Sequence, residues 1–184
     1  MEKRTKQTIT LGSGNLYIAE FKGSMPTDTE IEKEENLAGY IQGGAVLEYK
    51  PEYYTAEDDL GKVKKKIITK EEAKLKSGIM TWNAQTLKQL VATGRVTEDT
   101  EKGVRIIKIG GISNNDNKNY IIHFVHEDKV DGDVRVTIVG KNTAGFTLAF
   151  AKDKETVVDA EFEAIPSDDE GTLIIYKEEI EIKA

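Results

Sequence analysis

Apolar and polar residues alternate along much of this chain, which is the period of a β-strand with one buried face. Val134, Val136 and Ile138 fall on the same face of one such segment. Residues 157–165 place four apolar side chains on one face and three acids on the other. The acids are Asp159, Glu161 and Glu163. We expect each segment to be a strand with one face in the core and one in solvent.

Further strand-like segments recur at spacings of about ten to thirteen residues, separated by turn-rich pieces. We expect strands at residues 16–21, 104–112, 120–126, 134–140, 145–151, 157–165 and 173–176. Residues 120–126 are apolar on both faces, which is typical of a central strand or of one covered by a helix or another subunit. The predicted fold class is mainly β, an antiparallel β-sandwich or small barrel with one flanking α-helix.

The stretch from Trp82 to Gly94 differs because its apolar residues repeat with a helical period. Asn83 suits the N-cap, Trp82 has hydrophobic-staple spacing to Leu87, and Gly94 suits a left-handed C′ position. The pattern predicts a helix over about residues 83–93, the only helix expected. Its apolar stripe consists of Leu87, Leu90 and Val91. So short a helix is marginal alone, so we expect the stripe to dock on the β layer.

A long hairpin is predicted before this helix, over about residues 46–69, with its turn at 58–61. Three acids lie just before or within the turn and four lysines follow it: Glu57, Asp58, Asp59, Lys62, Lys64, Lys65 and Lys66. So many charges exclude the tip from a core of its own domain. Residues 23–36, which contain proline, glycine and many acids, are expected to form a solvated loop.

Length and composition indicate one globular domain over residues 1–184, with an N-terminal arm at residues 1–10. We expect the protein to be made and kept in a cytoplasm-like compartment. Charged residues make up 32% and hydrophobic residues 38%, which is too hydrophobic for disorder. The absence of cysteine excludes disulfides and thiolate chemistry. We see no signal peptide and no apolar run near the roughly 20 residues that span a bilayer. The net charge of −7 argues against wrapping nucleic acid.

Candidate chemical sites are weak, so we do not expect an enzyme, a cofactor or a metal. The glycine pairs at 12–14, 43–44 and 110–111 are expected to be turns or bulges, because none has a phosphate-loop context. His123 and His126 point to opposite faces of a strand and are expected at the surface or an interface. The asparagine-rich cluster around Asp116 lacks the spaced carboxylates of a calcium loop. The three acids of residues 157–165 favour a solvated face over a glycosidase pair.

Three stretches of the sequence resemble a known protein family, which the strand and helix patterns alone do not reveal. They are GYIQGGAVLEYKPEYYTAEDDLGKVKKKIITKEEAKLKSGIMTWN, ATGRVTEDTEKGVRIIKIGG and FTLAFAKDKETVVDAEFEAIPSDDEGTLIIYKEE. The chain, from about residue 11 to residue 182, resembles the major tail tube proteins of tailed bacteriophages of Gram-positive hosts. The resemblance implies a structural virion protein whose subunits close into hexameric rings, which stack into a tube that conducts the genome.

The resemblance also implies partners and contact residues. The partners are other copies of the chain and the tail terminator, tape-measure and distal tail proteins, and DNA passes through the tube without specific binding. Contacts between subunits and rings are expected from residues 52–66 and from residues before Leu11. The contact candidates are Tyr53, Tyr54, Glu57, Asp58, Asp59, Lys62, Lys64, Lys65 and Lys66. Asp159, Glu161 and Glu163 are candidates to face the lumen, with the outer surface as the alternative.

Two other classes of function stay open at this point. A tube protein of a phage-derived bacterial injection apparatus would share the fold but carry effectors or a spike. A soluble ligand-binding β-barrel would need a large apolar cavity with convergent polar groups.

Overall fold

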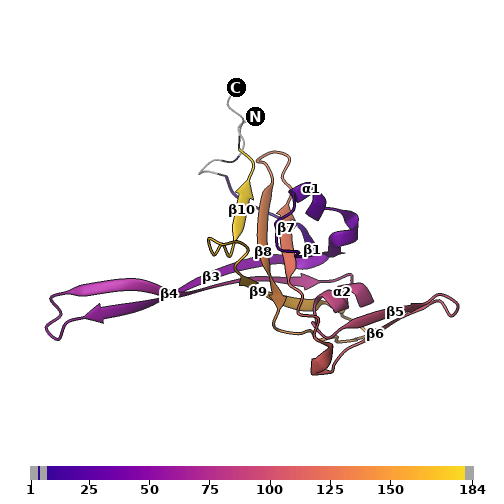
Figure 1. Ribbon diagram of the computed structural model, residues 1–184. Helices are drawn as coiled ribbons and strands as arrows, with labels where there is room; N and C mark the ends of the chain where they lie inside the picture. Colours follow the sequence, from indigo (N-terminus) through magenta and orange to yellow (C-terminus); the bar gives the residue numbers. More distant parts are fainter. Residues whose placement is uncertain (1–3, 5–7, 181–184) are drawn as a thin grey trace.

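The computed structural model describes Arg4 and residues 8–180, and its fold is mainly β with antiparallel pairing, as predicted (Figure 1). Residues 1–3, 5–7 and 181–184, which include most of the predicted N-terminal arm, lie outside the described residues. The strands are β1 Asn15–Glu20, β2 Leu37–Gly39, β3 Ile41–Glu57, β4 Lys64–Ile79, β5 Arg95–Asp99, β6 Val104–Lys108, β7 Tyr120–His126, β8 Val134–Asn142, β9 Val158–Ile165 and β10 Ile175–Glu178.

One sheet contains eight of these strands, in the order β2-β1-β7-β8-β9-β4-β3, with β10 also paired to β8. Strand β8 changes partners along its length: residues 134–137 pair with β10, and residues 139–142 pair with β9. The β7, β8 and β10 strands therefore run across the direction of β9, β4 and β3 (Figure 1). Gly140 lies at this change, where a Cβ atom would stand 2.0 Å from the carbonyl oxygen of Glu163. The bent sheet encloses the core without closing into a barrel.

The main core lies inside this bend and confirms the alternation read from the sequence. Val134, Val136 and Ile138 are buried on one face of β8, and the apolar residues of β9 are buried opposite them. Strand β7 lies between β1 and β8 and is buried on both faces, as expected for a central strand. A second, smaller cluster on the other side of β7 and β8 contains Ile31, Ile121 and Val139.

The predicted helix is present as α2, Ala84–Gln89, and it docks through its apolar stripe. The Asn83 side chain caps it by accepting from the N–H groups of Gln85 and Thr86. Leu87 and Leu90 are buried in the main core, and Val91 is half-buried. The helix is shorter than predicted because the N–H groups of Leu90, Val91 and Gly94 bond three residues back, in successive tight turns.

Gly94 does not adopt the left-handed conformation expected for a helix C′ residue. Its value is steric: a Cβ atom would lie 2.9 Å from a methyl carbon of Val91 and 3.3 Å from the Cα of Lys88. Glycine therefore lets the chain pass close over the end of α2.

The prediction of a single helix and a solvated loop before β2 is wrong. Residues 23–36 contain α1, Asp28–Ile31, and a 3-10 turn at Glu34–Asn36. Glu30 accepts from the backbone N–H and the hydroxyl of Thr27, which closes the first turn of α1. Ile31 is buried, so this short helix covers the second cluster. A second 3-10 turn, at Ile112–Asn114, shortens the strand expected over 104–112 to β6.

Residues 145–151 do not form the predicted strand, although Phe146 and Leu148 pack on the core. The reason is the Asn142 side chain. Its oxygen accepts from the N–H of Glu161, and its amide donates to the carbonyls of Leu90 and Gly145. Asn142 therefore occupies the edge of β9 that an added strand would need. Strands β2 and β5 were not predicted.

Both histidines are buried, which contradicts the expected surface or interface position. His123 Nδ1 lies 2.7 Å from the Thr137 hydroxyl, and its Nε2 lies 3.1 Å from a carboxylate oxygen of Glu32. His126 Nδ1 lies 2.7 Å from the carbonyl oxygen of Ser13. Burial is tolerated because each ring has a polar partner that the local strand pattern does not reveal.

Candidate assembly interface

The most prominent surface feature is a two-stranded extension that leaves the body of the molecule (Figure 1). Strand β3 pairs with β4 from Ile41↔Ile79 to Glu57↔Lys64, but β9 pairs only with Lys74–Ile79 of β4. From residue 49 to residue 73 the two strands therefore pair with each other alone, and we call this part the arm. It confirms the predicted long hairpin and its charged tip.

The tip of the arm is an ordered turn. The carboxylate of Asp58 accepts from the backbone N–H of Val63 at 2.6 Å and from that of Leu60 at 3.3 Å. These backbone hydrogen bonds, chiefly that from Val63, hold the pKa of Asp58 below its ordinary value. Gly61 takes φ +67°, which a side chain disfavours. The tip thus has a defined shape that hydrogen bonds within the turn maintain.

One face of the arm continues the core face of the sheet. Leu47 pairs with Leu75, Tyr49 with Ala73 and Tyr53 with Ile68, and directly paired residues share a face. Leu75 is buried in the core, whereas farther out Tyr49, Tyr53 and Ile68 are each about half exposed, at 50%, 50% and 51%. The opposite face carries a second exposed pair, Tyr54 and Ile67. The arm therefore exposes apolar side chains that no other described part of the chain covers.

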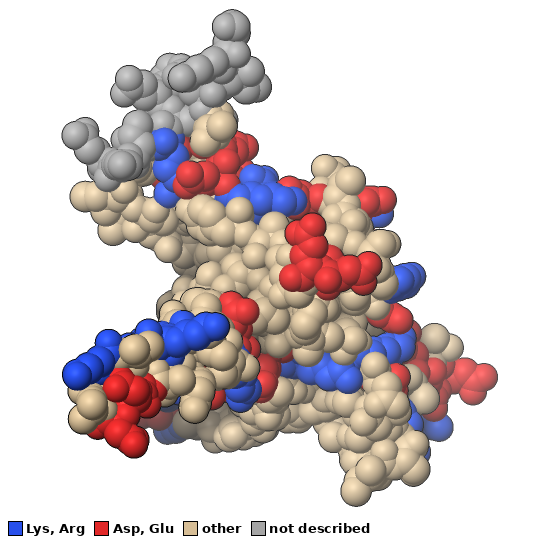
Figure 2. Space-filling model, turned by 60° about the vertical axis from the view of Figure 1, so that its left-hand side comes forward, with Lys and Arg blue, Asp and Glu red and all other residues tan. Residues whose placement is uncertain are grey.

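All nine contact candidates lie on the arm or in its turn, and all are exposed. Lys64 pairs with Glu57 at 2.9 Å, and the Lys66 ammonium lies 4.2 Å from the centre of the Tyr53 ring. Figure 2 shows a row of basic side chains along one edge of the forward-projecting arm and acidic side chains below its tip. The arm thus separates charge across its width while exposing tyrosines along its length.

The three lumen candidates share the outer face of β9, but their surroundings differ. Glu161 accepts from Lys74 at 2.7 Å and lies 3.4 Å from Lys76. The hydrogen bond from Lys74 is the main cause that lowers the pKa of Glu161. Glu163 lies opposite Lys74 and Lys141 in the strand register. Asp159 is exposed and has no ion pair within the described part of the chain.

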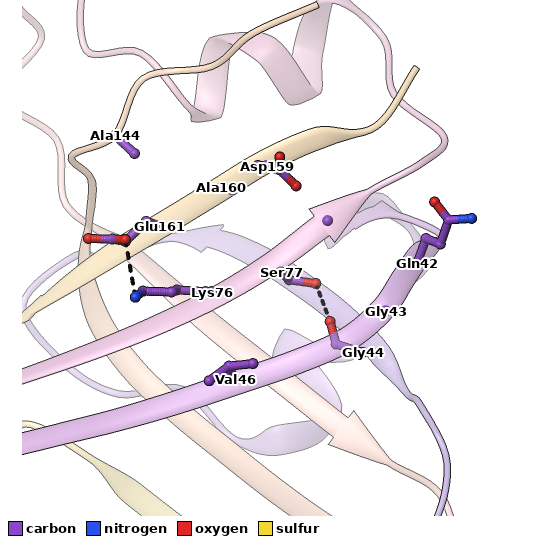
Figure 3. A pocket seen from close by; sticks show the side chains of 11 residues that line it. Gln42, Gly43, Gly44, Val46, Lys76, Ser77, Ala144, Asp159, Ala160 and Glu161 are labelled. Carbon is purple, nitrogen blue, oxygen red and sulfur yellow. Dashed lines mark hydrogen bonds and ion pairs between the residues drawn. The ribbon is translucent and has the colours of Figure 1, made fainter. Parts of the chain in front are cut away.

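A groove of about 320 Å³ lies at the base of the arm, over β3, β4 and β9 (Figure 3). It exists because β3 bulges at Gly43 and Gly44, with φ +80° and +75°, where the β3–β4 register shifts. The Ser77 hydroxyl donates to the carbonyl of Gly44 at 3.0 Å and holds the bulge against β4. The sequence predicted a turn or bulge here but not a groove, because Ala144 and β9 come from distant parts of the chain.

A second two-stranded sheet, β5–β6, projects from the other side of the body (Figure 1). Ile107 packs on the main core and anchors it, whereas Val104 and Ile106 are exposed. Their apolar pattern is that of an ordinary strand, so the sequence alone does not mark these residues as contacts.

No helix among the described residues is long and apolar enough to cross a bilayer, and in these same residues no three His, Cys, Asp or Glu side chains gather as metal ligands. A comparison of the chain with models of protein families and with curated proteins finds no match.

Proposed function

We propose that this chain is the repeating subunit of a bacteriophage tail tube, whose copies close into hexameric rings that stack around a genome channel. The proposal places the protein in the virion, after synthesis in the bacterial host. Its partners are other copies of itself and, at the tube ends and in the channel, terminator, distal tail and tape-measure proteins.

The observation that carries the proposal is the arm. An isolated two-stranded ribbon is marginally stable in water, because it has no third layer against which to bury its side chains. This ribbon nevertheless carries Tyr49, Tyr53, Tyr54, Ile67 and Ile68, all exposed. Covering such apolar surface contributes about 25 cal/mol per Å² removed from water. A surface of this kind favours a repeated contact with another copy.

The open sheet supports the same interpretation. Strands β2 and β3 end the order of the large sheet, so each has an edge with backbone groups unpaired by that sheet. Such edges pair readily with other chains. A contact between two different surfaces of one molecule repeats head to tail and closes into a ring when its rotation closes.

Net charge is consistent with a conduit for nucleic acid. DNA carries about one negative charge per 1.7 Å of axis. Each copy carries −7, so a ring of six copies carries −42. A channel of that sign would repel the phosphate backbone and let the genome pass without adhering.

A ligand-binding barrel is not favoured by this geometry. Its interior cavity requires a closed sheet, whereas the large sheet here is open. The groove beside the arm is at the lower end of the volume of ligand pockets.

Electron microscopy of the purified protein at rising concentration tests the proposal. We expect rings of six copies and then stacked tubes with a continuous central channel. A protein that stays monomeric at all concentrations, or forms only irregular aggregates, would contradict it.

A further inference from the structure

The groove at the base of the arm has the features of a socket for a small apolar side chain. Its lining includes Gly43, Gly44, Gly78, Ala144 and Ala160, and apolar atoms form most of its surface (Figure 3). A Cβ atom at Gly43 or Gly44 would meet nothing within 4 Å, so the space above the bulge is open. Adding a side chain at Gly78 would place its Cβ 2.8 Å from a methyl carbon of Val157.

The two carboxylates at the rim of the groove differ in their ion pairs. The Glu161 carboxylate is paired with Lys74 and Lys76, so it offers little to another cation. Asp159 also lines the groove and has no ion pair within residues that the structure describes. The groove therefore combines an apolar floor with one uncompensated carboxylate at its edge.

The tip of the arm presents the complementary features. Leu60 and Val63 are 74% and 69% exposed on a turn that the Asp58 carboxylate and Gly61 hold in shape. Lys62 lies between them, and its ammonium group has no ion-pair partner among the described residues. The tip therefore offers an apolar knob beside a free cation.

The arm is long enough to reach another molecule. Nine residues of β3, 49–57, span about 30 Å at about 3.3 Å per residue. A compact chain of 184 residues has a radius of gyration of about 16 Å. The arm thus extends by about the width of the body, so the tip of one copy can reach the arm base of a neighbour.

We infer that the Leu60 tip of one copy inserts into the Gly43–Gly44 groove of the next copy, where Lys62 pairs with Asp159. This inference rests on the proposed tube and names the surface that receives the arm. Each copy contributes one tip and one groove, so the contact is head to tail and repeats through the assembly.

Charge reversal provides the first test. Lys62→Glu and Asp159→Lys should each raise the concentration needed for tube formation by at least about fivefold, because attraction becomes repulsion. The double variant should recover most of the wild-type value. Lys129→Glu and Asp169→Lys are matched controls, since both residues lie outside the arm, are exposed and unpaired among the described residues, and make the same charge changes.

Engineered cysteines provide the second test, and the native chain has none to interfere. A variant with Leu60→Cys and Ala144→Cys should form, on oxidation of the assembled protein, a ladder of covalent oligomers longer than dimers. Variants with either cysteine alone should give at most dimers. A Leu60→Cys and Asp169→Cys variant is the geometric control and should give no ladder.

The two tests separate this inference from the proposed function. If the wild-type protein forms tubes, any one of three results would overturn the tip-in-groove contact alone. These results are charge reversals without effect, no recovery in the double variant, and no ladder of covalent oligomers. Failure of the wild-type protein to form tubes would instead overturn the proposed function. Isothermal titration with a peptide of residues 55–66 would then show whether the groove binds the tip outside a tube.

Discussion

Lys74 Nζ lies 2.7 Å from Glu161 Oε1, and this ion pair joins β4 to β9 at the last position where the arm has a third strand beside it. Lys76 extends the contact to Glu48 on β3, at 2.9 Å. The charges on this face therefore form a connected group across three strands. Glu161 is part of the support of the arm as well as a candidate for the lumen.

This relationship changes what charge reversal on β9 should do. Glu163→Lys removes no ion pair among the described residues and should lower the melting temperature only slightly, whereas Glu161→Lys brings a third cation beside Lys74 and Lys76 and should lower it more. If the outer face of β9 lines the channel, tubes of the Glu163→Lys variant should bind DNA in a salt-sensitive manner. Binding assays at several salt concentrations measure this effect, and tubes that bind no DNA would place Glu163 outside the channel.

Leu90 tests how α2 is attached. Its side chain is 2% exposed and packs in the main core. Leu90→Ala should lower the free energy of unfolding by about 2 to 5 kcal/mol, through lost transfer energy and a residual cavity. Leu60→Ala is the matched control, since Leu60 is 74% exposed. Denaturant titration compares them, and equal effects for the two variants would contradict docking through the stripe.

His123 should make stability depend on pH. Burial lowers the pKa of His123 below its ordinary value, although Glu32 opposes this shift. A histidine held neutral by the fold stabilises the protein fully above its unfolded pKa, about 6.5, and loses this contribution as the pH falls below that value. The free energy of unfolding should therefore decrease from pH 7 to pH 5. His123→Gln should flatten this dependence, whereas an unchanged slope would assign it to other groups.

Glu32 should add to the loss at lower pH. Burial raises the pKa of Glu32, but hydrogen bonds from Arg135 and His123 outweigh burial and leave the pKa below its ordinary value. Its contribution is thus present above the unfolded pKa, about 4.3, and is lost as the pH falls through the folded value. The two groups act in different pH ranges, which a pH series of denaturant titrations resolves.

Local patterns in the sequence were sufficient for several elements. The alternation at Val134, Val136 and Ile138 predicts β8 because a single strand needs only its own period. Asn83 and Leu87 likewise mark α2, since a helix cap and stripe are encoded within a few residues. The arm follows from one long hairpin pattern with a charged turn.

Other features depend on residues far apart in the chain. His123 is buried because Glu32, 91 residues away, and Thr137 satisfy its ring. The strand expected at 145–151 is absent because Asn142 occupies the β9 edge that it would use. The groove requires β3, β4, β9 and Ala144 together. No local period encodes such contacts, so they become visible only in the fold.

Shortening the arm tests whether it joins the subunits. Replacing residues 56–62 with a short Gly-Ser turn removes the tip but none of the core residues. We expect a folded monomer with an unchanged unfolding midpoint that forms no tubes, measured by gel filtration and electron microscopy. Tubes of normal width and length from this variant would show that the free strand edges join the subunits without the arm.

Amide hydrogen exchange of residues 52–66, measured in the monomer and in the assembled polymer of the unmodified protein, tests the role of the arm most directly. In the monomer these amides should exchange quickly, because the two-stranded ribbon is exposed and can open locally. In the polymer we predict strong protection across the segment, as a neighbouring copy covers it. Equally fast exchange in monomer and polymer would show that the arm remains in solvent and does not join the subunits.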